Sequence, residues 1–441
     1  MNRRLLTTTF SLVVIVAGTI AVIRFAKGYR PTSTGNVRAT GLLAANSFPN
    51  GASVYINGDL KTATDTTLNL EPGEYDIEIK KDGYTPWKKK IHIEKELVTQ
   101  TNAVLFPIAP SLTPLTFTGA ANITPSPDGQ QLLFTTASAA ASKSNGIYVM
   151  NLADSPISLQ RGPFQIALSS TSVDWSNSTF VWSPDSSQVI LKTTGRTYLL
   201  VTNKVNNLDT LPDVTARQST ILSEWNDLFE KKFTAALALF PKEIVTIATQ
   251  SAKNIYVSPD QERLLYTATA SAHLSETLLP PVVAANSQTQ SRDLIAGNTY
   301  VYDRTEDRNF EVIKGKEVVL VSPSPTPKTG IVRRVLPVAS QSATLAPVST
   351  FMDTLLAFRN KTSGLFTGSP QWLPDSKHII AATPTGISIS EYDGTNRTPI
   401  YAGPFEKQFV YPWPNGSKLI ILTNFNQSDS GGINLYALGL K

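Results

Sequence analysis

Five short apolar runs follow the same kind of turn at a constant distance along most of the chain. In each copy a Pro–Asp or Pro–Asn dipeptide comes first, and the apolar run begins four residues after the Asp or Asn. The turns are residues 126–129, 183–186, 258–261, 373–376 and 413–416, and the runs begin at Leu132, Val189, Leu264, Ile379 and Leu419. A fixed offset between a turn and an apolar run indicates an internal repeat.

The residue types in these turns predict a strand on each side. Proline presets φ for the second position of a type I turn, and Asp or Asn suits the next position. Apolar residues precede each turn, as at 180–182 and 255–257, and a further β-rich run follows most copies, as at 197–201. Three or four strands per repeat suggest radially stacked sheets. We therefore expect a mainly β fold in which residues 110–441 form a β-propeller of five or six blades.

The spacing of the repeats predicts insertions. Successive turn Asp or Asn residues are 57, 75, 115 and 40 positions apart, whereas a blade usually takes about 40–50 residues. The 75-residue interval contains a helical pattern over 220–240, after which Pro241 would end the helix. Its apolar face would consist of positions 221, 225, 228, 229, 233, 236, 237 and 240. We expect this helix to pack on the propeller rim; docking of a partner is the alternative.

The 115-residue interval contains two stretches of low complexity, 271–291 and 321–347, rich in Ser, Pro, Ala and Gln. Such segments bury little apolar surface, so we expect mobile loops there. A degenerate blade without the turn signature could lie between Lys328 and Phe366, and it would be the sixth.

The N-terminal segment is apolar and uncharged from Leu5 to Ile23. Nineteen residues rise about 28 Å as a helix, close to the thickness of the hydrocarbon core of a bilayer. A cleaved signal peptide is the alternative. We favour a retained anchor over residues 1–30, followed by a linker at 31–39, because no clear small-x-small cleavage site precedes Arg24. The economical topology leaves a short cytoplasmic tail and exports the remainder of the chain.

A separate β-rich unit occupies residues 40–107. Asn57 and Gly58 form a strong hairpin signal, and Pro72–Gly73 is typical of a type II turn. Residues 75–80 alternate between apolar and charged, which predicts a strand with one buried face. Five or six short strands in about 65 residues predict a small antiparallel β-sandwich.

This unit resembles the PEGA domain, which is named for a Pro-Glu-Gly-Ala turn. The matching turn here is 49–52, with Asn50 in place of Glu, and Val-Tyr-Ile-Asn-Gly at 54–58 and Gly-Tyr-x-x-Trp at 83–87 also match. The later repeats resemble the TolB-type, WD40-like propeller with its Ser-Pro-Asp-Gly turn. These resemblances imply a membrane-anchored protein of the bacterial cell envelope with a binding role, and they carry no catalytic residues over to this chain.

The composition narrows the possible chemistry. The chain has no cysteine, a net charge of +5 over 441 residues, and three histidines. Absence of cysteine excludes disulfides, thiolate metal sites and a cysteine nucleophile. The mild charge is weak support for nucleic acid binding, which we do not expect. Neither a phosphate-binding Gly-Lys-Ser/Thr loop nor a dinucleotide-binding glycine fingerprint is present.

No group of residues predicts a catalytic, cofactor or metal site. His92, His273 and His378 fall in three different units, and none has the spacing of a zinc site. Residues 428–432 (Ser-Asp-Ser-Gly-Gly) are similar to the nucleophile loop of trypsin-like proteases, but no histidine motif accompanies them, so we interpret them as a hairpin loop. The repeated turn Asp and Asn residues are expected to bond their own backbone.

Two further groups of residues have structural interpretations. Lys88, Lys89 and Lys90 could touch an anionic wall polymer or lipid headgroups, although a solvated strand end is the simpler interpretation. Trp182, Trp372 and Trp413 flank the turns and are expected to pack between blades. Binding residues stay unknown from the sequence.

The expected function is that of an envelope binding or scaffold protein, anchored in the cell membrane by its N-terminal helix. Its propeller would engage a protein or an envelope polymer without chemistry and without a cofactor. The alternative is an envelope lyase or hydrolase that acts on a glycan or peptide in the propeller channel. A sensor is a third possibility, but only about four residues precede the apolar run.

Overall fold

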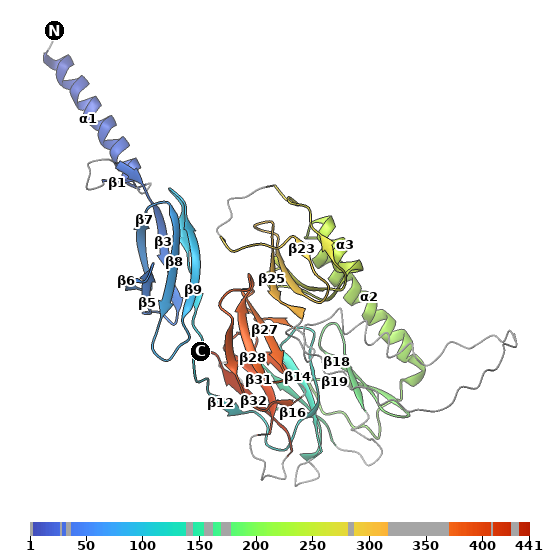
Figure 1. Cartoon of the computed structure of the whole chain (residues 1–441). Coiled ribbons are helices and arrows are strands. Elements are labelled where there is room, and N and C mark those ends of the chain that lie inside the picture. The colour runs from blue at the N-terminus through green and yellow to red at the C-terminus, as the bar shows by residue number, and fades with distance from the viewer. Residues whose placement is uncertain are drawn as a thin grey trace, which may run out of the picture.

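The computed structural model describes residues 3–26, 29–31, 37–137, 144–153, 162–168, 178–280, 286–315, 370–406, 409–424 and 432–441. The chain is mainly β, with one helix projecting at its N-terminal end (Figure 1). This helix is α1 (Arg3–Ala26). Its segment Thr7–Arg24 has a mean hydropathy of 1.8 with none of it buried, so by length and composition it could cross a membrane. The antiparallel strands β1 (Tyr29–Pro31) and β2 (Val37–Ala39) follow.

The next unit packs two main sheets around one apolar cluster. Strand order is β10-β3-β7 in one sheet and β6-β5-β8-β9 in the other, with β11 paired to β4. The strands are β3 (Gly41–Ala45), β4 (Ser47–Phe48), β5 (Ser53–Ile56), β6 (Asp59–Ala63), β7 (Thr66–Leu70), β8 (Gly73–Lys80), β9 (Trp87–Ile93), β10 (Val98–Gln100) and β11 (Ala103–Val104). Leu43, Val54 and Ile79 are among the buried residues of the shared cluster.

The predicted local features of this unit are present. Asn57 and Gly58 both have positive φ, 51° and 89°, as a tight hairpin turn with two left-handed residues requires. In β8, Ile77 and Ile79 are buried, and Glu78 between them faces the other side. The alternating pattern therefore does place one face of this strand in the core.

Within the described residues, five antiparallel sheets of three or four strands follow the PEGA-like unit. Sheet 1 is β13-β14-β15-β16, sheet 2 is β17-β18-β19, sheet 3 is β20-β21-β24-β25, sheet 4 is β26-β27-β28-β29, and sheet 5 is β12-β32-β31-β30. The strands are β12 (Leu112–Pro114), β13 (Ala121–Pro125), β14 (Gln131–Thr136), β15 (Gly146–Asn151), β16 (Phe164–Leu168), β17 (Thr179–Trp182), β18 (Gln188–Lys192), β19 (Thr197–Val201), β20 (Ala252–Val257), β21 (Arg263–Ala268), β24 (Thr299–Asp303), β25 (Arg308–Ile313), β26 (Gln371–Trp372), β27 (His378–Thr383), β28 (Gly386–Glu391), β29 (Thr398–Tyr401), β30 (Val410–Pro412), β31 (Lys418–Thr423) and β32 (Asn434–Gly439). In sheets 1 to 4 the repeated turn joins the first two strands, and in sheet 5 it joins β30 and β31. Strand β12 joins the edge of sheet 5 by pairing with β32.

Buried clusters link these sheets in sequence. One cluster joins sheets 1 and 2, another joins sheets 3 and 4, and a third joins sheets 4 and 5. Sheet 5 returns to sheet 1, because Tyr411 and Trp413 pack with Leu132 and Phe134. Sheets 2 and 3 are bridged by helices instead, which pack on sheet 2 at one end and on sheet 3 at the other.

The bridging helices are α2 (Gln218–Leu237) and α3 (Lys242–Gln250), preceded by the short helix η2 (Thr215–Arg217). The predicted helix is present, but it ends at Leu237, and Leu228 on its expected apolar face is 52% exposed. Pro241 does not end the helical region, because a second helix, α3, begins directly after it and was not predicted from the sequence. Proline suits a helix start because its φ is preset and the first backbone N–H groups have no partner within the helix.

The sequence predicts a mobile loop with little buried apolar surface at 271–291, and the structure differs from this in part. Its strand β22 (Ala272–His273) pairs with β23 (Asp293–Leu294), and the side chain of Leu274 is fully buried. The low-complexity stretch 321–347 and the suggested degenerate blade at 328–366 lie outside the described residues.

Candidate functional site

In each repeated turn, the side chain of the Asp or Asn residue accepts hydrogen bonds from groups of the same turn. In the first turn, Oδ1 of Asp128 accepts hydrogen bonds from the Ser126 hydroxyl (2.5 Å) and from the backbone N–H of Gln130 (3.0 Å). The same backbone bond, two residues onward, is made to Asp185, Asp260, Asp375 and Asn415. These side chains therefore stabilise the turns, as the sequence analysis expected.

Aromatic side chains connect neighbouring sheets close to these turns. The indole N–H of Trp182 donates to the carbonyl of Thr124 in sheet 1, and that of Trp372 donates to the carbonyl of Tyr256 in sheet 3, both at 3.0 Å. Trp413 lies in the cluster shared by sheets 5 and 1. The expectation that the three tryptophans pack between repeats is confirmed.

A cavity of about 480 Å³ opens where the turns of sheets 1, 2 and 3 meet strands β20, β26 and β30, which precede the turns of sheets 3, 4 and 5. We call it the turn cavity. Helix α2 supplies one wall through Phe229, Lys232 and Phe233, and the remaining lining is largely proline, aromatic and aliphatic. Asp128 and Lys232 are its charged lining residues. An apolar hollow with few polar groups is typical of a binding site.

One polar side chain in the turn cavity lacks a complete set of partners. Gln371 is 3% exposed, and its side-chain N–H donates to the carbonyl of Val410 at 2.8 Å. Its side-chain oxygen is buried and accepts no hydrogen bond from any described residue. An unpaired buried acceptor costs free energy, so a bound group with an N–H or O–H would be favoured here. No motif in the sequence singles out this residue.

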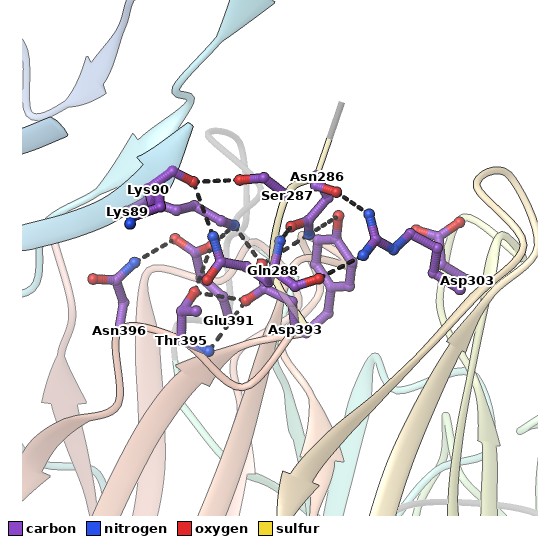
Figure 2. Close-up of polar contacts among 12 residues, drawn as sticks. Lys89, Lys90, Asn286, Ser287, Gln288, Asp303, Glu391, Asp393, Thr395 and Asn396 are labelled. Carbon is purple, nitrogen blue, oxygen red and sulfur yellow. Dashed lines mark hydrogen bonds and ion pairs between the residues drawn. The ribbon is translucent and has the colours of Figure 1, made fainter. Parts of the chain in front are cut away.

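A second polar centre lies where β9 meets sheet 4 (Figure 2). The ammonium of Lys89 is 2.6 Å from Oε2 of Glu391 and 2.5 Å from Oδ2 of Asp393. The Asp393 side chain is fully buried, and those of Lys89 and Glu391 are 13% and 11% exposed. Lys89 is therefore part of a buried ion-pair cluster between the two units, and not of a solvated strand end or a surface for anionic polymer.

Charge balance sets the pKa values in this cluster. Burial alone would lower the pKa of Lys89, but attraction to Glu391 and Asp393 outweighs it and raises that pKa. Burial alone would likewise raise the pKa of Asp393, but Lys89 and hydrogen bonds from neighbouring side chains lower it overall. Lys89 and Asp393 therefore both stay ionised near neutral pH.

Further contacts hold the two units together. The Trp87 indole N–H donates to Glu391, and the Lys88 backbone N–H donates to the side chain of Asn396 at 2.8 Å. The Lys90 carbonyl accepts hydrogen bonds from Ser287 and Gln288 (Figure 2). Past β11, Phe106 is buried in the cluster shared by sheets 4 and 5. The linkage between the units is therefore both polar and apolar.

The histidines lie apart, as their positions in the sequence suggested. His92 is exposed on β9, and His273 is hydrogen-bonded to Asp293 at 2.6 Å, which raises its pKa. His378 is buried, with Nδ1 2.6 Å from Oδ2 of Asp375 and its ring edge-on to Phe106. Within the described ranges, no group of three or more His, Asp or Glu side chains is placed to hold a metal ion. Residues 428–431 lie outside the described part of the chain, so the hairpin interpretation there stays a prediction.

Solved structures similar to this chain include two TolB proteins. The putative TolB from Agrobacterium tumefaciens is 12% identical, with 74% of this chain and 84% of that chain covered and a TM-score of 0.21. TolB from Acinetobacter baumannii is 10% identical, with 83% of this chain and 60% of that chain covered and a TM-score of 0.21. No curated protein sequence matches the chain. Residues 40–108 match the family model of the PEGA domain, so this part of the chain is a PEGA domain, as the turn at 49–52 had indicated.

Proposed function

We propose that the protein is a membrane-anchored binding or scaffold protein of the cell envelope. In this proposal α1 is a retained anchor with a cytoplasmic N-terminus, and the PEGA domain is a small sandwich outside the membrane. The five sheets form a five-bladed propeller, in which α2 and α3 stand between the second and third blades. The propeller binds an apolar segment of a protein partner without chemistry.

The turn cavity is the observation that carries this proposal. Its walls combine Phe229 and Phe233 of α2 with proline and aromatic residues from the repeats. Burying apolar side chains of a partner there would gain about 25 cal/mol for each Å² removed from water. The buried oxygen of Gln371 would accept a hydrogen bond from the partner's backbone or side chain.

Helix α2 supplies the part of the cavity wall that is specific to this chain. The repeats explain the turns and the first strands, whereas Phe229, Lys232 and Phe233 come from an insertion that the repeat does not require. A partner that contacts these α2 side chains would bind this propeller in preference to propellers that have the same turns but lack the insertion. The cavity therefore supports the alternative given for the helical pattern over 220–240, that it docks a partner.

Site-specific photo-crosslinking of the full chain in its native membranes tests the proposal. A photoreactive residue at Phe233 should give a discrete crosslinked protein, and Phe233→Asp should abolish partner recovery by a probe at Phe229. Leu228 lies on the same helix, is 52% exposed and does not line the cavity, so a probe there is the matched control. Equal crosslinking from Leu228 would contradict the proposal, and turnover of a glycan or peptide library would favour an envelope enzyme instead.

A further inference from the structure

Two large apolar side chains are exposed at the end of the PEGA domain that lies next to α1. Leu97 is 44% exposed, and Val98, the first residue of β10, is 57% exposed. They follow each other directly after the charged stretch 94–96. Exposed apolar side chains that are grouped and bordered by polar residues often mark a contact with a protein or a membrane. The position of this pair decides between the two.

Two side-chain contacts connect the pair with the last turn of α1, which leads into this end of the domain (Figure 1). The guanidinium carbon of Arg24 lies 5.8 Å from the centre of the Tyr29 ring. The Tyr29 hydroxyl donates to Oε1 of Glu96 at 2.9 Å, and Leu97 comes directly after Glu96. The carbonyl of Leu97 in turn accepts from the backbone N–H of Leu42 in β3 at 2.9 Å, so the exposed pair is tied to the PEGA domain.

The length of α1 places this end of the domain at the level of lipid headgroups. Thr7–Arg24 has 18 residues, which rise about 27 Å as a helix and match the hydrocarbon core of a bilayer, about 30 Å thick. Arg24 then lies at the edge of the hydrocarbon, and the headgroup layer extends about 5–8 Å beyond it. Tyr29 contacts Arg24 and so lies in that layer, where tyrosine is enriched in membrane proteins. This step rests on the retained anchor of the proposed function.

The charges at this end fit an electrically neutral lipid surface. The turns 71–74 and 94–97 together carry four glutamates and one lysine, and the segment 24–39 adds four basic residues and no acidic one. Five basic minus four acidic residues leave a sum of +1. Such a small charge gives little attraction to an anionic surface, so the apolar pair supplies the affinity. Because α1 already holds the domain at the bilayer, contact with lipid carries no further cost of bringing two molecules together.

We propose that Leu97 and Val98 insert into the headgroup layer of the membrane that holds α1. The PEGA domain then rests on the bilayer through a second, apolar contact, and the bond between Tyr29 and Glu96 holds the inserting loop beside the end of the anchor. Two contacts fix the tilt of the domain, whereas one helix with a linker would leave it free. The ion-pair cluster at Lys89 passes this orientation on to the sheets. The contact is separate from the turn cavity and does not depend on the proposed protein partner.

Fluorescence quenching of single-cysteine variants tests this inference, because the chain has no cysteine of its own. Full-length Leu97→Cys carries a bimane label in nanodiscs of phosphatidylcholine. Lipids spin-labelled near the headgroup should quench this label severalfold more than they quench a label at Leu60→Cys, and aqueous iodide should quench it severalfold less. Leu60 is the matched control, because it is 60% exposed and its strand neighbours place it level with Glu78, five positions along β8 from Gly73 at the α1 end. That is a separation of about 17 Å.

Several results would overturn the inference. If the chain stays in the nanodiscs but iodide quenches the labels at Leu97 and Leu60 equally, the anchor stands and the second contact is wrong. If the chain does not enter the nanodiscs, the retained anchor and this inference fail together. Loss of lipid quenching at high salt would show an electrostatic contact, which salt screens, and would contradict the apolar one. Protection of the Leu97 label from both quenchers would show that protein covers the pair instead of lipid. Val98→Cys, at the neighbouring exposed position, should repeat the result of Leu97→Cys and guards against a local effect of one substitution.

Discussion

Replacing Lys89 with methionine should loosen the contact between the PEGA domain and sheet 4. The substitution keeps the apolar length of the side chain and removes its charge, which leaves Glu391 and Asp393 close together without a counterion. Removing one partner of a buried ion pair costs about 3–5 kcal/mol. Because Lys89 and Glu391 are 13% and 11% exposed, we expect the lower end, about 3 kcal/mol. Each difference of about 1.4 kcal/mol changes an equilibrium constant tenfold, so the population of the open state, in which the PEGA domain and sheet 4 are separated, should rise by roughly a hundredfold.

Hydrogen–deuterium exchange of the full chain measures this opening at a suitable reporter. The backbone N–H of Lys88 donates to the side-chain oxygen of Asn396 across the junction at 2.8 Å. In Lys89→Met, exchange in the segment that contains Lys88 should accelerate, and exchange within the core of β8 should not. Such local opening is what exchange reports when it costs less than global unfolding.

Two further variants separate the charge from the packing. Lys90→Met is the matched control, because this neighbouring lysine is exposed and its replacement should change exchange little. Adding Glu391→Gln and Asp393→Asn to Lys89→Met removes the uncompensated charges and should restore most of the protection. If Lys89→Met and the wild-type chain exchange alike at Lys88, the ion pair does not hold the domains together and the reasoning is wrong.

The remaining predictions concern pH, packing and hydrogen bonding. The pKa of Asp393 is lowered in the folded protein, so its contribution to stability is present above its ordinary value near 3.8 and is lost as the pH falls through the lower folded value. Protection of the junction against exchange, taken relative to the intrinsic amide exchange rate at each pH from 6 to 3, should therefore fall only at the acid end. Phe106→Ala should lower the free energy of unfolding, measured in urea, by about 3–5 kcal/mol, because Phe106 is only 4% exposed. Ile108→Ala is the control: this residue is 67% exposed, so its replacement should lower that free energy by less than about 0.5 kcal/mol. Trp372→Phe removes the donor to the buried carbonyl of Tyr256 and should cost about 1–3 kcal/mol in the same assay, with Trp372→Ala costing more.

Much of the fold could be predicted because the signals are local. Proline followed by Asp or Asn specifies a turn within four residues, and the apolar run after it specifies a strand, so the repeats needed no knowledge of distant contacts. The Asn57–Gly58 hairpin and the alternation in β8 were predictable for the same reason. Helix α3 was missed because Pro241 was interpreted only as a stop, although proline is equally compatible with a helix start.

The candidate sites could not be predicted, because they depend on contacts between distant segments. Lys89 and Asp393 are about 300 positions apart, and a run of three lysines gives no sign that the middle one is buried. Gln371 has no neighbour in sequence that marks it as a cavity residue. Phe233 was placed correctly on the apolar face of a helix, but the pattern could not say that part of this face would line a cavity.

The pairing of β12 with β32 constrains how the protein is made. About 320 residues separate Pro114 from its partner Tyr436. At roughly 5–20 residues per second, translation leaves β12 without its partner strand for some tens of seconds. During that time its edge can pair with other chains, as unpaired strand edges do. Sheet 5 is completed only when the last strand arrives, so chains truncated before β32 should aggregate or be degraded, however many of the earlier sheets they contain.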